Sequence, residues 1–215
     1  MIIVYTQFHK KSLEFLNQFI KSANKEKTDN IKIKFIFNFN QVLLSKKELS
    51  NLKKLNFDFD IFFTNEPQHQ ARIKVLKKLK KLNFSHIIFI DSDDLFYKNR
   101  ILKISKEIKK YDFLVNNLVV YKSGKILNKW IKFDKKIIKL SDVDDQNFIG
   151  LSNLTITKKV LVWMLKQKFN LKAIAFDWVL IKSILLNNFN GCFKKNIFTL
   201  YRKYVSNVIG NNKNY

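Results

Sequence analysis

An apolar run that ends abruptly in acidic residues constrains the fold of this chain more than any other feature. His86-Ile87-Ile88-Phe89-Ile90 is followed directly by Asp91-Ser92-Asp93-Asp94. A short run of this apolar, β-branched type is typical of a central strand that is buried on both faces of a sheet. The carboxylates that follow repel one another, and the end of a buried strand makes the repulsion worse. A compensating positive charge is therefore expected there.

The rest of the sequence alternates short apolar runs with longer segments of helical period, which indicates an α/β fold. With 215 residues, of which 47% are hydrophobic, the chain is expected to form a single domain with a sizeable core. Strands are predicted at residues 2–6, 31–37, 60–63 and 86–90, and helices after Ser12 and at about 43–55, 68–82, 99–110 and 179–186.

The acidic cluster predicts a divalent metal. In an open α/β sheet the carboxyl ends of the strands border the ligand crevice. Hard carboxylate oxygens suit Mg²⁺ or Mn²⁺, which keep open positions for the phosphates of a nucleotide diphosphate. A simpler alternative is that Asp93 or Asp94 caps the helix predicted at 99–110. An EF-hand is not supported, because Phe96 and Leu102 stand where its loop needs Gly and Glu.

The formal net charge of +24 favours a polyanionic partner, either nucleic acid or an anionic membrane surface. The charge alone does not choose between them. A coding bias toward Lys, Ile, Asn and Phe, the residues of AT-rich codons, accounts for part of it. Carboxylates at the end of the central strand argue against a nucleic-acid-binding surface.

Other sequence features exclude several classes of protein. The single cysteine, Cys192, cannot form an internal disulfide, and a buried apolar role in a reducing compartment is expected. The N-terminus reads as a first strand and not as a leader, and no apolar run is long enough to span a bilayer, so a soluble or peripheral protein is expected. A Gly-rich phosphate loop and a Gly-x-Ser-x-Gly element are missing, and the three histidines lack metal-ligand spacing.

Several motifs together resemble the core of family 2 glycosyltransferases. In chain order they are Ala71-Arg72, the apolar run ending in Asp91-Ser92-Asp93-Asp94, Asn99-Arg100-Ile101, Phe176-Asp177-Trp178 and Tyr201-Arg202-Lys203-Tyr204. The resemblance covers most of the chain. It implies the GT-A fold, a Rossmann-like, open, twisted and mostly parallel sheet with flanking helices.

The resemblance also implies roles for individual residues. Asp91 would lie by the nucleotide ribose, and Asp93 together with Asp91 would hold Mn²⁺ or Mg²⁺ against the diphosphate. Asp177 would be the catalytic base that takes the proton of the attacking acceptor hydroxyl. The remaining nucleotide contacts are expected from Thr6, Asn38, Arg72 and Arg202.

The chain departs from the family pattern at three places. Phe37-Asn38-Phe39-Asn40 stands where an Asp followed by small residues is usual, Phe176 replaces an acid, and Ile73 replaces an Asn. Judged without the resemblance, Asp177 could instead cap the helix predicted at 179–186, and Arg72 could be an ordinary surface cation.

We therefore expect transfer of a sugar from a nucleotide sugar, a UDP-sugar being favoured, to a glycan or lipid-linked acceptor in cell-surface polysaccharide synthesis. The reaction is expected to be metal-dependent and inverting. The nucleotide-binding half is expected at residues 1–95 and the acceptor-binding half at 96–215, with specificity set by loops at about 118–139 and 141–154.

The expected location is cytoplasmic, at the inner face of the plasma membrane, where an anionic surface would be a further partner and nucleic acid would not. The acidic segment 141–146 is either a solvated loop or part of the acceptor site. Two other functions remain open. One is a basic nucleic-acid-binding protein, and the other is a GT-A-like protein that binds a nucleotide sugar without turning it over.

Overall fold

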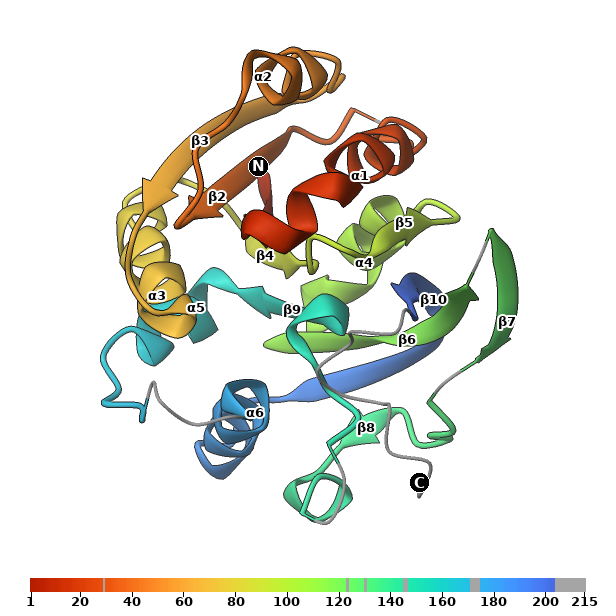
Figure 1. Ribbon diagram of the computed structural model, residues 1–215. Coiled ribbons are helices and arrows are strands. Elements are labelled where there is room, and N and C mark those ends of the chain that lie inside the picture. The colour runs from red at the N-terminus through yellow and green to blue at the C-terminus, as the bar shows by residue number, and fades with distance from the viewer. Residues whose placement is uncertain (29, 123, 130, 145–146, 171–174, 204–215) are drawn as a thin grey trace.

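The computed structural model describes residues 1–28, 30–122, 124–129, 131–144, 147–170 and 175–203. Within these residues the chain forms one twisted sheet with helices on both faces (Figure 1). The strands are β1 (Ile2–Phe8), β2 (Ile33–Asn40), β3 (Asp58–Thr64), β4 (His86–Phe89), β5 (Leu95–Tyr97), β6 (Phe113–Lys122), β7 (Lys125–Lys129), β8 (Ile137–Ile138), β9 (Leu154–Thr157) and β10 (Gly191–Arg202).

The α-helices are α1 (Leu16–Ala23), α2 (Lys46–Leu52), α3 (Gln68–Leu79), α4 (Arg100–Glu107), α5 (Lys158–Met164) and α6 (Phe176–Leu186). Short 3₁₀ turns are η1 (Lys10–Phe15), η2 (Ile108–Lys110), η3 (Leu140–Asp142) and η4 (Leu151–Asn153). None of the helices in the described ranges is long and apolar enough to cross a membrane.

The strand order along the sheet is β3-β2-β1-β4-β9-β6-β10-β5, with β7 beside β6 and β8 beside β10. The first four strands in this order are parallel to one another, and β6 and β10 are parallel to each other. β9 runs antiparallel between β4 and β6. The predicted α/β class, with an open, mostly parallel sheet and flanking helices, is confirmed.

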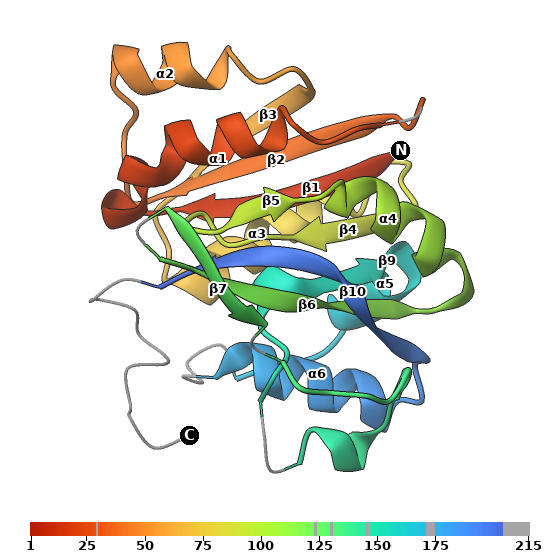
Figure 2. The same cartoon turned by 90° about the vertical axis from the view of Figure 1, so that its right-hand side faces the viewer.

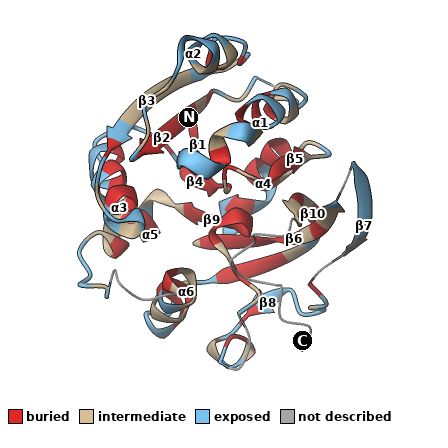
Figure 3. Ribbon diagram, viewed as in Figure 1, coloured by how far each residue is buried: buried red, intermediate tan, exposed pale blue. Residues whose placement is uncertain are grey.

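Side chains alternate along the strands between two hydrophobic cores, one on each face of the sheet. Helices α1, α2 and α4 cover the face on which Phe35, Phe37 and Phe39 of β2 stack in a row. Helices α3, α5 and α6 cover the other face, over Ile3 of β1 and Ile87 of β4. Figure 2 shows the helices in layers on either side of the sheet, and Figure 3 shows that the strands between them are mostly buried.

The elements predicted in the first half of the chain are present, but several of their ends differ. β1 continues to Phe8, whose ring stacks on Phe39 with centroids 5.4 Å apart. α2 is shorter than predicted, because Ser45 and Glu48 form a capping box that fixes its start. β4 is confirmed as a central strand, since all its residues are buried and it pairs with β1 and β9.

The second half was predicted less well. The expectation of loops at 118–139 and 141–154 was wrong in part, because β6 extends to Lys122, β7 and β8 follow, and η4 and the first residue of β9 lie in the second range. Helix α6 begins at Phe176, earlier than predicted. The division into a nucleotide-binding and an acceptor-binding half stays a prediction.

Candidate active site

The acidic cluster lies where β4 ends, near the middle of the sheet. The N–H of Asp94 donates to the carbonyl of Asp91 at 3.1 Å and closes a tight turn directly after the strand. The N–H of Asp91 donates to Ser152 Oγ in η4 at 3.2 Å. The cluster is therefore held by the segment that leads into β9, a neighbour of β4 in the sheet.

Asp91 and Asp93 are both partly exposed. Burial of the carboxyl group, and then the negative charge of Asp93, raise the pKa of Asp91 to about 7, while Arg72 and Arg100 act in the opposite direction. In the described part of the chain, no hydrogen bond reaches the carboxylate of Asp91. Burial and the nearby charge of Asp93 therefore destabilise the ionised form of Asp91, and a bound cation would stabilise it.

Asp94 has a structural role that the sequence did not reveal. Ser152 Oγ donates to its Oδ2, and the N–H of Arg202 donates to its Oδ1 at 2.9 Å. Burial and the charges of Asp93 and Asp91 raise the pKa of Asp94 well above its usual value. Both oxygens of Asp94 already accept hydrogen bonds, so this carboxylate supports the turn, and Asp91 is the carboxylate of the cluster that accepts no hydrogen bond in the described residues.

The alternative that Asp93 or Asp94 caps the following helix is wrong. Helix α4 begins at Arg100, and Glu26, from the segment after α1, accepts the N–H of Ile101 at 2.7 Å. Burial raises the pKa of Glu26, while hydrogen bonds from the backbone at the start of α4 lower it. A distant carboxylate thus satisfies the first turn of this helix.

Arg100 is fully buried and ties three segments together beneath the acidic cluster. Its Nη2 donates to the carbonyls of Phe89 and Ser152, both at 2.9 Å, and its Nε donates to Asn116 Oδ1 at 3.1 Å. Burial lowers the pKa of Arg100 to about 10, and the charges of Glu26, Asp94 and Asp91 oppose that change. Arg100 therefore supplies part of the positive charge that the cluster requires.

Arg72 lies near the start of α3 and is buried, so the alternative of a surface cation is wrong. Its Nη1 lies 3.0 Å from Nδ1 of His69. Burial raises the pKa of Asp91, of Asp177 and of the Tyr5 hydroxyl, and the charge of Arg72 opposes this rise in each case, so the guanidinium lies within electrostatic reach of all three groups. The fold thus brings Arg72, Asp91 and Asp177 together from three separate elements.

Asp177 is the second residue of α6 and does not cap that helix, because the capping position is Ala175. Its Oδ1 accepts the N–H of Trp178 at 2.9 Å and lies 3.5 Å from Asn147 Nδ2. Burial raises the pKa of Asp177. Gly150 lies beside this carboxylate, since a Cβ added to the glycine would lie 3.5 Å from Asp177 Oδ2, an ordinary van der Waals contact.

Arg202 lies at the end of β10 and reaches the acidic cluster. Its Nε donates to the carbonyl of Asp93 at 2.7 Å. The guanidinium carbon lies 4.5 Å from the ring centroid of Phe15 and 5.6 Å from that of Tyr121, which is cation–π geometry. Of the late Tyr-Arg segment, Tyr204 lies outside the described residues.

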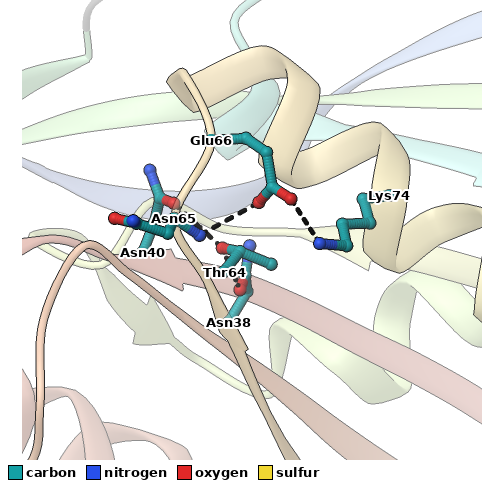
Figure 4. Close-up of polar contacts among 6 residues, drawn as sticks. All are labelled: Asn38, Asn40, Thr64, Asn65, Glu66 and Lys74. Atoms are coloured by element: carbon teal, nitrogen blue, oxygen red, sulfur yellow. Dashed lines mark hydrogen bonds and ion pairs between the residues drawn. The ribbon is translucent and has the colours of Figure 1, made fainter.

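Thr6 and Asn38 are both fully buried in their strands. Thr6 Oγ1 has no hydrogen-bond partner among the described residues. Asn38 Nδ2 donates to the Tyr5 hydroxyl at 3.3 Å, and Asn38 Oδ1 lies 2.9 Å from the Thr64 hydroxyl. Figure 4 shows Thr64 between Asn38 and Asn40, beside the Glu66–Lys74 ion pair. A nucleotide contact of Thr6 or Asn38 stays a prediction, and it would require these side chains to become accessible.

Sequence reasoning missed the polar residues that support the site. Ser152, Asn153, Asn116 and Thr199 are all buried. Asn153 Nδ2 donates to the carbonyl of Asn116 at 3.0 Å, and Asn116 Nδ2 donates to Thr199 Oγ1 at 3.0 Å. Residues of these types occur throughout the chain, so nothing in the sequence distinguishes them.

A divalent cation suits the residues present. Asp91 has a carboxylate without a hydrogen-bond donor in the described ranges, and its neighbours are further carboxylates. No group of three or more His, Cys, Asp or Glu side chains that could hold a metal occurs among the described residues. The carboxylate oxygens of Asp91 and Asp93 are of the chemical type that Mg²⁺ or Mn²⁺ binds together with substrate phosphates and water.

Comparison with known proteins gives matches at the level of structure. No family model matches the sequence, and no curated protein matches it. S. aureus TarS 1–349 in complex with UDP-GlcNAc aligns with a TM-score of 0.74 and 12% identity, over 96% of this chain and 59% of that chain. GalNAc-T7 with UDP, GalNAc and Mn²⁺ aligns with a TM-score of 0.72 and 13% identity, over 96% of this chain and 44% of that chain.

TarS 1–349 in complex with UDP also aligns, with a TM-score of 0.72 and 12% identity, over 94% of this chain and 60% of that chain. This chain thus spans less than two thirds of the length of each of these structures. At such identities the likeness shows the fold. The chain has a GT-A glycosyltransferase fold, as the sequence motifs predicted.

Proposed function

We propose that this chain is a glycosyltransferase that transfers a sugar from a nucleotide sugar, with a UDP-sugar as the favoured donor. The observation that carries the proposal is the convergence of Arg72, Asp91 and Asp177 beside the end of the central strand. Two similar structures add support, since one contains UDP-GlcNAc and another contains UDP, GalNAc and Mn²⁺.

The donor half of the site would be formed by two aspartates and two arginines. Asp91 and Asp93 would hold Mg²⁺ or Mn²⁺, and Asp91 would also contact the ribose. When bound, such an ion neutralises the negative charge that develops on a departing nucleoside diphosphate. Arg72 and Arg202 both place positive charge near the cluster and suit the phosphate oxygens.

The acceptor half would depend on Asp177. An acceptor hydroxyl must lose its proton as it attacks the anomeric carbon, and a carboxylate within hydrogen-bond reach can take that proton. Burial keeps the pKa of Asp177 above that of an ordinary aspartate, which makes its carboxylate a stronger base. A single attack of this kind inverts the configuration at the anomeric carbon.

We further propose that the acceptor is a glycan or lipid-linked precursor of a cell-surface polysaccharide. The reaction would take place on the cytoplasmic side, at the inner face of the plasma membrane. The formal charge of +24 supports this location, since an anionic lipid surface attracts basic proteins.

Calorimetric titration tests the donor site directly. UDP and GDP are titrated into the protein with Mn²⁺ and with a chelator, and again into the Asp93→Ala variant. We expect micromolar binding of UDP that requires both the ion and Asp93. Binding of neither nucleotide under any condition would contradict the proposal and favour a nucleic-acid-binding function.

Turnover distinguishes an active glycosyltransferase from a protein that only binds the nucleotide sugar. A protein that binds the nucleotide sugar without using it would show the same metal-dependent titration but would release no UDP from UDP-sugars in the presence of acceptors. A salt-sensitive affinity for RNA or DNA that is unchanged in Asp93→Ala would instead favour the nucleic-acid-binding alternative.

A further inference from the structure

His69 connects the two helices that carry Arg72 and Asp177. It lies in the first turn of α3, one turn before Arg72. Its ring stacks on Phe176, with centroids 4.6 Å apart and planes inclined by 24°. Phe176 is fully buried and immediately precedes Asp177 at the start of α6. The stack therefore joins the donor side of the site to the acceptor side.

The contact between His69 and Arg72 fixes the protonation of the imidazole. Nδ1 of His69 lies 3.0 Å from Nη1 of Arg72. A guanidinium nitrogen can only donate, so Nδ1 must be the acceptor and the ring proton must be on Nε2. Burial and the charge of Arg72 lower the pKa of His69 to about 4, so the ring is neutral near pH 7.

A neutral partner has a specific advantage for Arg72. The guanidinium lies within electrostatic reach of Asp91 and Asp177. An ion pair with either carboxylate would neutralise its positive charge and weaken its attraction for phosphates. An arginine side chain also has considerable rotamer freedom, which a hydrogen bond from one nitrogen restricts. His69 accepts that hydrogen bond without neutralising the cation, which leaves the charge available to phosphates.

We propose that His69 is a positioning residue that holds Arg72 in the orientation required for nucleotide binding, through its unprotonated Nδ1 and its stack on Phe176. This inference rests on the proposed function, since it concerns the same donor site. It assigns His69 a role through Arg72 and not through contact with the substrate.

Three variants separate the hydrogen bond from the packing. His69→Gln retains an acceptor oxygen and a planar amide, whereas His69→Phe retains the stack and loses the acceptor. Gln70→Ala, at an exposed position of the same helix turn, is the matched control. Affinity for UDP with Mn²⁺ is measured by calorimetry for each variant.

We expect His69→Phe to bind UDP about tenfold more weakly, the order of one hydrogen bond to a charged group, and His69→Gln to stay within about threefold of wild type. In an Arg72→Ala background, His69→Phe should cause no further loss, because the two residues act as one unit. Equal losses in the Gln and Phe variants, or an unaffected Phe variant, would overturn the inference while the proposed function stands.

A second measurement does not depend on ligand. Long-range ¹⁵N–¹H correlation spectra of the wild-type protein report which imidazole nitrogen carries the proton. We expect the His69 proton on Nε2, and a change in the Nδ1 shift in Arg72→Ala. A proton on Nδ1 would refute the His69–Arg72 pairing. If the wild-type protein binds neither UDP nor GDP, the proposed function fails, and the role of His69 in the donor site fails with it.

Discussion

The hydroxyl of Ser152 and the carboxylate of Asp94 are hydrogen-bonded although 58 residues separate them. The same hydroxyl accepts the N–H of Asp91 at 3.2 Å. One small side chain in η4 therefore holds both ends of the turn that carries the acidic cluster. The turn carries the candidate metal ligands, so loss of this bond should affect stability and nucleotide binding together.

Ser152→Ala removes this support. The variant leaves a buried carboxylate oxygen of Asp94 without its donor, and such a loss costs about 1–3 kcal/mol of unfolding free energy. Urea unfolding measures this cost. Ser141→Ala, at an exposed position, is the control and should stay within about 0.5 kcal/mol of wild type. An unchanged stability of Ser152→Ala would show that water replaces the hydroxyl.

Arg100→Met should be more destabilising than Ser152→Ala. Methionine keeps much of the side-chain volume but leaves Asp94 and Glu26 without a buried positive charge. Removal of one member of a buried charge network costs about 3–5 kcal/mol. The comparison is with Lys109→Met, an exposed cation just after the same helix, which should have little effect. Similar melting temperatures for both variants would contradict the bridging role of Arg100.

The first half of the fold was predictable because its signals are local. The apolar run of β4 identified a strand that is buried along its whole length, whereas the start of α2 was predicted too early, although Ser45 and Glu48 form a capping box there. Strands β6 and β10 gave no such signal. Asn116 and Asn117 interrupt β6 and resemble loop residues, yet both are buried because distant groups such as Arg100 Nε and the carbonyl of Ile131 bond to them.

The candidate site was likewise predictable only where its residues belong to local motifs. The motifs identified Asp91, Arg72 and Asp177, and the structure gathers them, although their roles stay predictions. The supporting residues could not be found from sequence, because Ser152 and Glu26 act on partners more than fifty residues away. A hydrogen bond across the fold leaves no periodic pattern and no motif along the chain.

Asp177→Asn tests the proposed chemistry separately from binding. Asparagine keeps an oxygen that accepts the Trp178 N–H, so the start of α6 should be unchanged. It cannot take a proton, and the loss of a general base lowers kcat by about 10²–10⁴-fold. We expect the affinity for UDP with Mn²⁺ to stay within about threefold of wild type. Steady-state kinetics measure kcat, and calorimetry on the same preparation measures the affinity for UDP. Full activity of the variant would rule out Asp177 as the base.

The buried His86 should make the stability of the fold depend on pH, whatever the function of the protein. The residue is 3% exposed in β4, Nδ1 lies 3.0 Å from Ser85 Oγ, and Nε2 has no hydrogen-bond partner in the described part of the chain. Burial and the charge of the N-terminal amine lower the pKa of His86 from 6.5 to about 4. Between these values the unfolded chain binds a proton that the folded chain does not, so this group destabilises the fold as the pH falls.

His86→Leu should remove that contribution. The unfolding free energy of the wild-type protein, measured in urea at several values between pH 7 and pH 4, contains a term from His86 that reaches about 3 kcal/mol. Buried carboxylates with raised pKa values, such as Asp94, act in the opposite sense and are common to both proteins. The difference between wild type and variant therefore isolates the histidine. We expect this difference to shift in favour of the variant as the pH falls, and a difference that is constant with pH would show that His86 is protonated as readily in the folded chain as in the unfolded one.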